Sequence, residues 1–255
     1  MSRTFTKNLS NYMSLGANSL GSLMNGAAFV ALSCWAKAAS FTSVVSRNTS
    51  ISAQIGVNTT AIGFFVYDGS ANKLRVLARS QSSDSSQIAT GTTTLSTGTL
   101  YHFGVLIDYA ADTIYLYLNG SLETTASVTF AGTTYTHTNV TDAGYHDAVG
   151  SFFGTAVPIS TDHQFDGEIG ECALWAHSSA PLVTADFAAL YAGKSPLRVG
   201  AVLPAWYMQI QGSASPETSL RGSLSGTITG SLPQATHPTV YGYPSVFTPE
   251  VLRAA

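Results

Sequence analysis

The segment from residue 101 to residue 122 places the strongest constraint on the fold. Apolar side chains occupy every second position on both sides of a short polar turn: Phe103, Val105 and Ile107 before it, and Ile114, Leu116 and Leu118 after it. Such alternation puts every second side chain on one face of a pleated strand. The segment then reaches Asn119-Gly120, a dipeptide that readily adopts the two positive φ angles of a tight hairpin turn. These features predict an antiparallel hairpin at the centre of a sheet with one buried face.

Strand-like runs recur along most of the chain at intervals of roughly ten residues. They lie at 27–38, 40–47, 51–57, 61–67, 73–80, 149–155, 165–175 and 203–211. Asn, Asp, Gly and Ser between the runs are typical of turns, and no helices alternate with the strands. This order predicts an all-β fold of two antiparallel sheets packed face to face, rather than a parallel sheet with crossover helices.

One segment after these strands predicts a short helix. Phe187, Leu190 and Tyr191 are spaced i, i+3 and i+4, which places them on one face of a helix. Thr184 precedes them as a candidate N-cap, and Gly193 follows at a position that favours a left-handed residue after the helix. We therefore expect one short helix that packs its apolar face on the sandwich.

Few residues of this chain are charged. Asp, Glu, Lys and Arg make up 10% of its 255 residues, against about 25% in a typical globular domain, and the formal net charge is −3. No basic run is present to neutralise phosphates, so nucleic acid is not expected as a partner. The first residues lack the apolar stretch of a signal peptide, and no apolar run is long enough to span a membrane. We therefore expect a protein made in a cytoplasm, with no membrane partner.

A change of composition divides the chain into two parts. Residues 1–211 carry the strands and the helix, whereas 212–255 are rich in Ser, Gly, Thr and Pro, and 222–249 contain no charged residue. Disordered tails usually remain soluble through charge, which this segment lacks. We interpret it as an extended arm that becomes ordered on a partner's surface, while a flexible tail stays open as the alternative. The candidate partner-binding residues of the arm are Tyr241, Tyr243, Val246 and Phe247.

Four segments stand out by their order along the chain. They are FVALSCWAKA at 29–38, YHFGVLIDYAADTIYLYLNGSLE at 101–123, FDGEIGECALW at 165–175 and LVTADFAALYAG at 182–193. Together they resemble the concanavalin A-like (laminin G-like) jelly-roll family. The resemblance implies a two-sheet jelly-roll sandwich in which the strands of Trp35 and Trp175 lie close together. Cys34 and Cys172 would then approach each other, as two buried free thiols or as a disulfide.

Other features are similar to copies of this domain in tailed-bacteriophage virion proteins. They are the uncharged Ser/Thr/Gly-rich composition and the closing Leu-Pro-Ala-Trp-Tyr segment at 203–207, followed by a Pro-rich end. This resemblance implies a non-enzymatic structural protein of a virion, most concretely a capsid decoration or cement protein. It would attach by its loops and the C-terminal arm to the major capsid protein or other virion proteins, and we expect a homo-oligomer.

Glycoside hydrolases also occur on this fold, and they need two carboxylates that face each other across the substrate. Glu168 and Glu171 are the candidates on a strand, but regular alternation puts them on opposite faces unless a bulge intervenes. No Gly-x-Ser-x-Gly motif or Cys/His pairing indicates nucleophilic catalysis. We therefore expect no enzymatic activity and assign no catalytic residue.

Oxygen and imidazole donors are frequent in two polar segments. Such donors on loops suit calcium, although their spacing matches no metal-binding motif. Calcium therefore stays open as a ligand, and no other cofactor is expected. The residues concerned are His137, Asp142, His146, Asp147, Asp162, His163 and Asp166.

A long polar segment at 131–148 suggests an alternative function. Sugar recognition needs an aromatic platform beside polar donors, and such sites often lie on loops at the rim of a sandwich. Tyr135, Tyr145 and His146 supply these groups. The alternative hypothesis is a carbohydrate-binding, lectin-like module of a head or tail fibre that adheres to host surface glycans.

Overall fold

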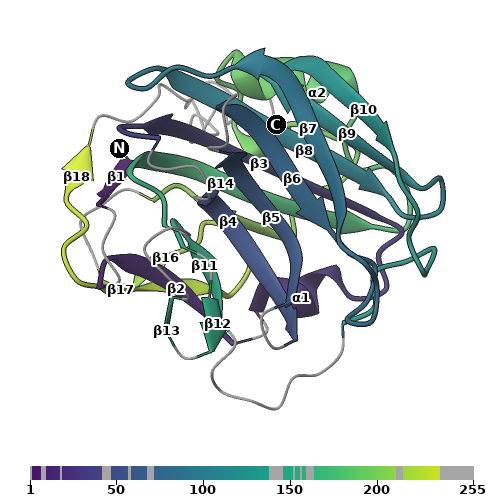
Figure 1. Cartoon of the computed structure of the whole chain (residues 1–255), viewed down its shortest axis with the longest axis horizontal. Coiled ribbons are helices and arrows are strands. Elements are labelled where there is room, and N and C mark those ends of the chain that lie inside the picture. Colours follow the sequence, from purple (N-terminus) through teal and green to yellow (C-terminus); the bar gives the residue numbers. More distant parts are fainter. Residues whose placement is uncertain are drawn as a thin grey trace, which may run out of the picture.

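The chain forms a layered β structure, shown in Figure 1. The computed structural model describes residues 2–6, 10–17, 19–41, 47–56, 59–67, 72–137, 146–151, 153–155, 157–158, 164–210 and 215–235. Within these residues, no helix is long and apolar enough to cross a membrane.

Two antiparallel eight-stranded sheets build the sandwich. Sheet A contains, in spatial order, β10 (Ser121–Ser127), β9 (Thr113–Leu118), β8 (Leu100–Asp108), β3 (Phe29–Ala38), β14 (Gly167–His177), β1 (Ser2–Phe5) and β18 (Gln234–Ala235), with β15 (Trp206–Met208) paired to β14. Sheet B contains β16 (Glu217–Thr218), β17 (Ser225–Thr229), β2 (Tyr12–Ala17), β11 (His146–Val149), β4 (Arg47–Gly56), β5 (Thr59–Tyr67), β6 (Lys73–Ala78) and β7 (Gln87–Thr94). A separate pair is formed by β12 (Phe153–Thr155) and β13 (Val157–Pro158). The predicted two-sheet jelly-roll sandwich is thus confirmed.

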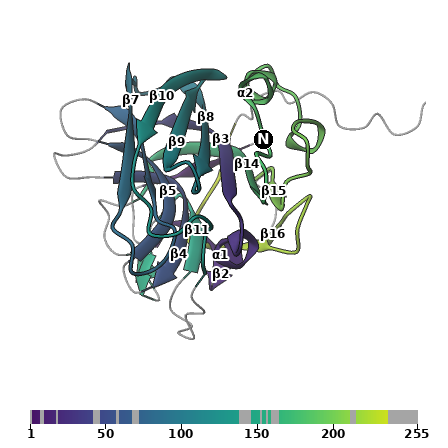
Figure 2. The same cartoon turned by 90° about the vertical axis from the view of Figure 1, so that its right-hand side faces the viewer.

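The central strands of sheet A, β8, β3 and β14, are largely buried on both faces, and Figure 2 shows them as a middle layer between sheet B and α2 (Thr184–Tyr191). The inner face of sheet A contributes Val105, Ile107 and Leu174 to the main core between the sheets. Its outer face contributes Tyr117 and Trp175 to a second apolar cluster with α2. The face of sheet B that points away from sheet A is therefore the side of the sandwich that α2 does not cover.

The central hairpin is confirmed. β8 and β9 pair in register from Phe103 with Leu118 to Asp108 with Thr113. The turn into β10 has positive φ at both predicted positions, 49° at Asn119 and 78° at Gly120. Glycine at position 120 also serves packing, because a β-carbon there would lie 2.8 Å from the Ala188 Cα of α2.

The predicted helix is present as α2. It begins one residue earlier than a Thr184 cap would place it, because Val183 is the N-cap residue and its backbone N–H donates to Asp186 Oδ2 at 2.9 Å. Gly193 follows the helix with a φ of 91°, as expected for a helix C-terminus. A second helix, α1 (Ser19–Met24), was not predicted, since its six residues are too few to show a helical period.

The strands of Trp35 and Trp175 are neighbours, as the family resemblance implied. β3 pairs with β14, and the register shifts between Gly170 and Ala173, which places Cys34 and Cys172 near each other across the pair. Both thiols are free and fully buried. Burial and the neighbouring Cys34 thiol raise the pKa of Cys172 well above its usual value. These cysteines are therefore part of the apolar core.

The sandwich continues past residue 211, the boundary that composition suggested. β17 pairs with β2 in sheet B, and β18 pairs with β1 in sheet A. A buried ion pair joins the same parts of the chain, with 2.9 Å between Arg3 Nε and Glu217 Oε2. Residues 217–235 are thus strands and connections of the domain, whereas Tyr241, Tyr243, Val246 and Phe247 lie outside the described residues.

Candidate functional site

A pocket with several hydroxyl-bearing side chains in its lining lies on the outer face of sheet B, at the end formed by β17, β2 and β11. Its volume is about 350 Å³, within the usual range for small-molecule sites. Three strands that are far apart in the sequence contribute to it. The described lining residues are Tyr12, Ser14, Leu15, Gly16, His146, Ser225, Thr227 and Thr229.

Strand alternation explains why the polar side chains gather here. On β2, Met13 and Leu15 belong to the main core, so Tyr12, Ser14 and Gly16 face outward. On β17 the buried Gly226 and the core-packed Ile228 alternate with residues that line the pocket. The lining residues of β17 are Ser225, Thr227 and Thr229.

The register between β2 and β17 sets these side chains side by side. Thr227 pairs with Ser14, and Thr229 pairs with Tyr12. Directly opposite residues on antiparallel strands have β-carbons about 5 Å apart, so each pair forms one rung of the pocket wall. The pocket therefore presents several hydroxyl groups side by side on two neighbouring strands.

A short hydrogen bond orients His146 at the pocket. Its Nδ1 lies 2.5 Å from Ser14 Oγ. Ser14 Oγ also accepts the backbone N–H of Gly16 at 3.2 Å, which holds the serine side chain in place. This contact fixes the position of the imidazole ring, so Ser14 acts as a positioning residue for the histidine.

The residue after His146 anchors this strand from the other side. Asp147 is fully buried and its Oδ2 accepts the backbone N–H groups of Leu20 at 2.5 Å and Gly21 at 3.2 Å. Ser19 Oγ donates to the same oxygen at 3.2 Å. Asp147 thus binds the first turn of α1, which holds β11 and its histidine against β2.

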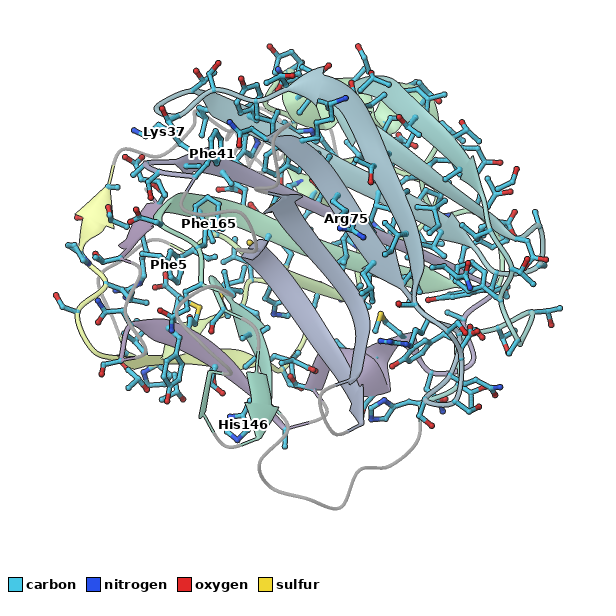
Figure 3. The ribbon with its side chains drawn as sticks, in the orientation of Figure 1. Phe5, Lys37, Phe41, Arg75, His146 and Phe165 are labelled. Carbon is cyan, nitrogen blue, oxygen red and sulfur yellow. The ribbon has the colours of Figure 1, made fainter. Side chains whose placement is uncertain are left out.

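The three residues predicted for sugar binding have different positions. His146, labelled in Figure 3, lines the pocket, but on strand β11 rather than on a loop. Tyr135 is fully buried, and its ring lies 6.3 Å from that of Tyr109 in the core. The structure therefore corrects its role, because a ring without exposed surface cannot stack on a sugar. Tyr145 lies outside the described residues.

The possible calcium ligands are not brought together where the structure describes them. Asp147 binds α1, and Ser40 Oγ donates to Asp166. His137 Nδ1 lies 3.3 Å from the Tyr135 hydroxyl, and burial lowers the pKa of this histidine. Among the described residues, no group of three or more His, Cys, Asp or Glu side chains could hold a metal ion. Asp142, Asp162 and His163 lie outside those residues.

A β-bulge lies between Glu168 and Glu171 on β14, as the sequence pattern required for these two side chains to share a face. The register of β14 shifts after Gly170, and Glu171 has a φ of 53°. Ile169 and Cys172 consequently both belong to the main core, and the two glutamates lie on the other face.

Both glutamates are engaged by other side chains. Glu168 Oε1 lies 2.5 Å from Lys37 Nζ. Glu171 is only 2% exposed, and it accepts hydrogen bonds from the Tyr207 hydroxyl and, at 3.4 Å, from Gln209 Nε2. This arrangement binds Glu171 into the packing around β15 instead of opening it to a substrate.

Sequence reasoning missed most of the pocket. Tyr12 and Ser14 lie in β2, where short apolar and polar residues gave only a weak pattern. Ser225, Thr227 and Thr229 lie in the segment interpreted as an arm. The alternation of small or apolar residues at 226 and 228 with hydroxyl residues around them was the signal that could have revealed an amphipathic strand.

The fold defines the class of this protein, an antiparallel jelly-roll sandwich of the concanavalin A-like type. Residues 7–181 match the Laminin_G_3 family, described as the concanavalin A-like lectin/glucanases superfamily. That match spans more than half of the chain, so the chain belongs to this family. No curated protein sequence matches it.

Solved structures with a similar fold include a candidate carbohydrate-binding protein from Bacteroides ovatus. It has a TM-score of 0.64 at 16% identity, and the similarity covers 94% of this chain and 61% of that protein. The chain thus spans less than two thirds of that protein's length. A heptameric SAP-like pentraxin from Limulus polyphemus has a TM-score of 0.56 at 14% identity, with 89% and 94% of the two chains covered.

A third similar structure is the CBM40 module of the Ruminococcus gnavus IT-sialidase, bound to α2,3-sialyllactose. Its TM-score is 0.51 at 11% identity, and the similarity covers 75% of this chain and 94% of that module. Identities this low show a shared fold alone. They do not show that this chain binds the ligands of those proteins.

Proposed function

We propose that the chain is a carbohydrate-binding, lectin-like module that holds a glycan in the pocket between β17, β2 and β11. The observation that carries this proposal is the combination of Tyr12, His146 and a row of hydroxyl side chains around one pocket. An aromatic ring stacks on the apolar face of a sugar, and hydroxyl and imidazole groups exchange hydrogen bonds with its hydroxyls. Similar folds in a candidate carbohydrate-binding protein and in a sialyllactose-bound module support the proposal.

The partner of such a module is a surface glycan, in keeping with adhesion to a host cell. Adhesion requires binding without turnover, and the described lining contains no pair of carboxylates for glycoside hydrolysis. The module therefore serves to hold a sugar in place.

A glycan array followed by calorimetric titration of the best-bound oligosaccharide tests this function. Tyr12→Ala should weaken binding roughly tenfold through lost stacking, and His146→Gln should also weaken it. The matched controls are Tyr191→Ala and His177→Gln, which change a 45% exposed tyrosine on α2 and a histidine at the end of β14, both on the sheet A side. Full affinity in both pocket variants, or loss in Tyr191→Ala instead, would place binding elsewhere.

A second proposal concerns where the module acts. We propose a virion location, with residues 236–255 as the attachment to capsid protein or sister copies. The observation that favours it is the apolar, proline-containing composition of the chain end, which carries no charge before Glu250. Because few ionic contacts would be involved, attachment to particles should withstand high salt. Release of the protein from particles in molar NaCl would contradict this location.

A further inference from the structure

The pocket differs from an ionic binding site in the chemistry of its described lining. Phenol, hydroxyl, imidazole and aliphatic groups make up this lining, with no carboxylate, ammonium or guanidinium group among them. Three of the hydroxyl groups belong to one strand, β17, and Ser225 and Thr227 there are exposed to solvent. The described walls thus offer hydrogen bonds without a formal charge from an acidic or strongly basic side chain.

Three charged residues close to these strands, among those that the structure describes, are committed to other contacts. Asp147 follows His146 directly, but its carboxylate is fully buried and accepts the backbone N–H groups at the start of α1. Glu217 lies on the strand beside β17, and it is paired with Arg3 at 2.9 Å, both side chains being less than 10% exposed. Arg3 Nη1 also donates to the Leu232 carbonyl oxygen at 2.7 Å. These side chains turn into the protein and do not line the pocket.

The uncharged side chains of the described lining favour neutral sugars over acidic sugars and over sugars bound through calcium. A carboxylate or sulfate on a sugar would lose hydration in the pocket without gaining a cationic partner, and such a loss is costly. A bridging calcium ion needs several oxygen ligands, chiefly carboxylates and carbonyls. A neutral sugar needs only hydroxyl, amide and imidazole partners together with an aromatic face.

We infer that the pocket binds uncharged sugar residues and does so without a divalent metal ion. This inference rests on the proposed carbohydrate-binding function and specifies its ligand class. It separates the chain from the CBM40 module of similar fold, whose bound ligand, sialyllactose, is an acidic sugar. Specificity would come from the hydroxyl rows of β2 and β17 and from the orientation that Ser14 gives to His146.

The test uses an array of neutral, sialylated, uronic-acid and sulfated oligosaccharides, probed with the full chain in calcium chloride and in EDTA. Neutral glycans should dominate, and their affinity should change less than about twofold between the two buffers. Thr227→Val keeps the shape of the side chain and removes one hydroxyl, so affinity should fall up to about tenfold. Thr94→Val, at an exposed threonine of β7 in the same sheet, is the matched control.

A charge substitution probes the inference from the opposite direction. Thr227→Lys places a cation on the pocket wall, so it should weaken neutral binding and add binding to acidic glycans, whereas Thr94→Lys should do neither. Circular dichroism confirms that each variant is folded. Binding of the unmodified chain to acidic glycans alone, or its loss in EDTA, would overturn this inference and leave carbohydrate binding intact. Failure of the folded chain to bind any glycan would overturn the proposed function and this inference together.

Discussion

At the scale of single residues, His102 is an unusual feature of the outer face of sheet A. Its Nε2 lies 2.8 Å from Ser33 Oγ, while its buried Nδ1 has no hydrogen-bond partner. The ring also lies beside two aromatic side chains, with ring centroids 5.2 Å away at Trp35 and 6.5 Å away at Tyr191. Burial lowers the pKa of His102 to about 3. The folded protein thus keeps this histidine neutral.

This burial predicts a specific loss of stability in acid. Below about pH 6.5 the unfolded chain protonates this histidine, whereas the folded protein does not do so until its much lower pKa is reached. The free energy of unfolding should therefore fall by up to about 1.4 kcal/mol per pH unit from this group alone. Urea unfolding across this range should show a shallower decline in His102→Gln than in the unmodified chain. His177→Gln is the control, and an equal slope in His102→Gln and the unmodified chain would contradict the assignment.

Gly104 illustrates how tightly α2 packs on sheet A. A β-carbon at this position would lie 2.5 Å from Phe187 Cδ1 and 3.2 Å from Tyr117 Cβ. The Phe187 ring has little room to move, because it stacks on Tyr117 with 3.9 Å between ring centroids. Gly104→Ala should therefore destabilise the fold by about 1–3 kcal/mol.

A double-mutant cycle measures whether that clash is the cause. In a Phe187→Ala background the same Gly104→Ala change should cost much less, because the ring that it meets is gone. Thermal and urea unfolding of the four proteins give the coupling energy. Additive costs would show that the glycine is required for another reason.

At the scale of elements, a carboxylate joins the edges of the two sheets. Glu123 on β10 accepts the backbone N–H groups of Thr92 at 2.7 Å and Thr93 at 2.5 Å, both on β7. Partial burial raises the pKa of Glu123, but the hydrogen bonds from Thr93 and Thr92 outweigh it, so the pKa is lowered overall. A lowered folded-state pKa contributes stability that is present at neutral pH and lost as pH falls through it.

Glu123→Gln should consequently reduce the melting temperature at neutral pH, since the amide accepts these hydrogen bonds less strongly than the carboxylate. The difference between the variant and the unmodified chain should shrink below about pH 4, where the carboxylate becomes protonated. Calorimetric melting across this range provides the measurement. A difference that stays constant with pH would show that the ionised form has no special role.

Local patterns were enough to predict the hairpin and the helix. Phe103, Val105 and Ile107 alternate within a few residues of one another, and Asn119-Gly120 specifies the turn by its own conformational preference. The pocket has no comparable local signal. Tyr12, His146 and Thr227 meet only because the sheet order places β2 between β11 and β17, and alternation within a strand does not encode its neighbours.

The dependence on long-range pairing also explains why the sequence did not predict the burial of Tyr135 or the C-terminal strands. Tyr135 follows a polar segment, yet its backbone N–H donates to the Ala27 carbonyl and its ring enters the core, a contact across more than a hundred residues. The 225–229 strand is short and rich in hydroxyl residues, so composition favoured an arm. Its role became visible only through its pairing with β2.

At the scale of the whole molecule, the two ends of the described chain complete one domain. β1 lies between β14 and β18, and β2 lies between β17 and β11. Arg3 is bound by Glu217 and by the Leu232 carbonyl, so the C-terminal strands supply partners for a side chain at the start of the chain. The pocket depends on the same strands, because β17 supplies one of its walls.

Two truncations therefore separate stability and glycan binding from attachment. A chain ending at Ala235 keeps β18 and the Arg3–Glu217 pair, so it should melt close to the full chain and bind glycans with unchanged affinity. A chain ending at residue 211 loses Glu217, β17 and β18, so it should melt well below the full chain and lose glycan binding together with the pocket wall. The proposed virion attachment involves only the segment after Ala235, so on that proposal the protein that ends at Ala235 should no longer remain on particles. Glycan binding by a folded chain ending at residue 211 would show that β17 is not part of the site.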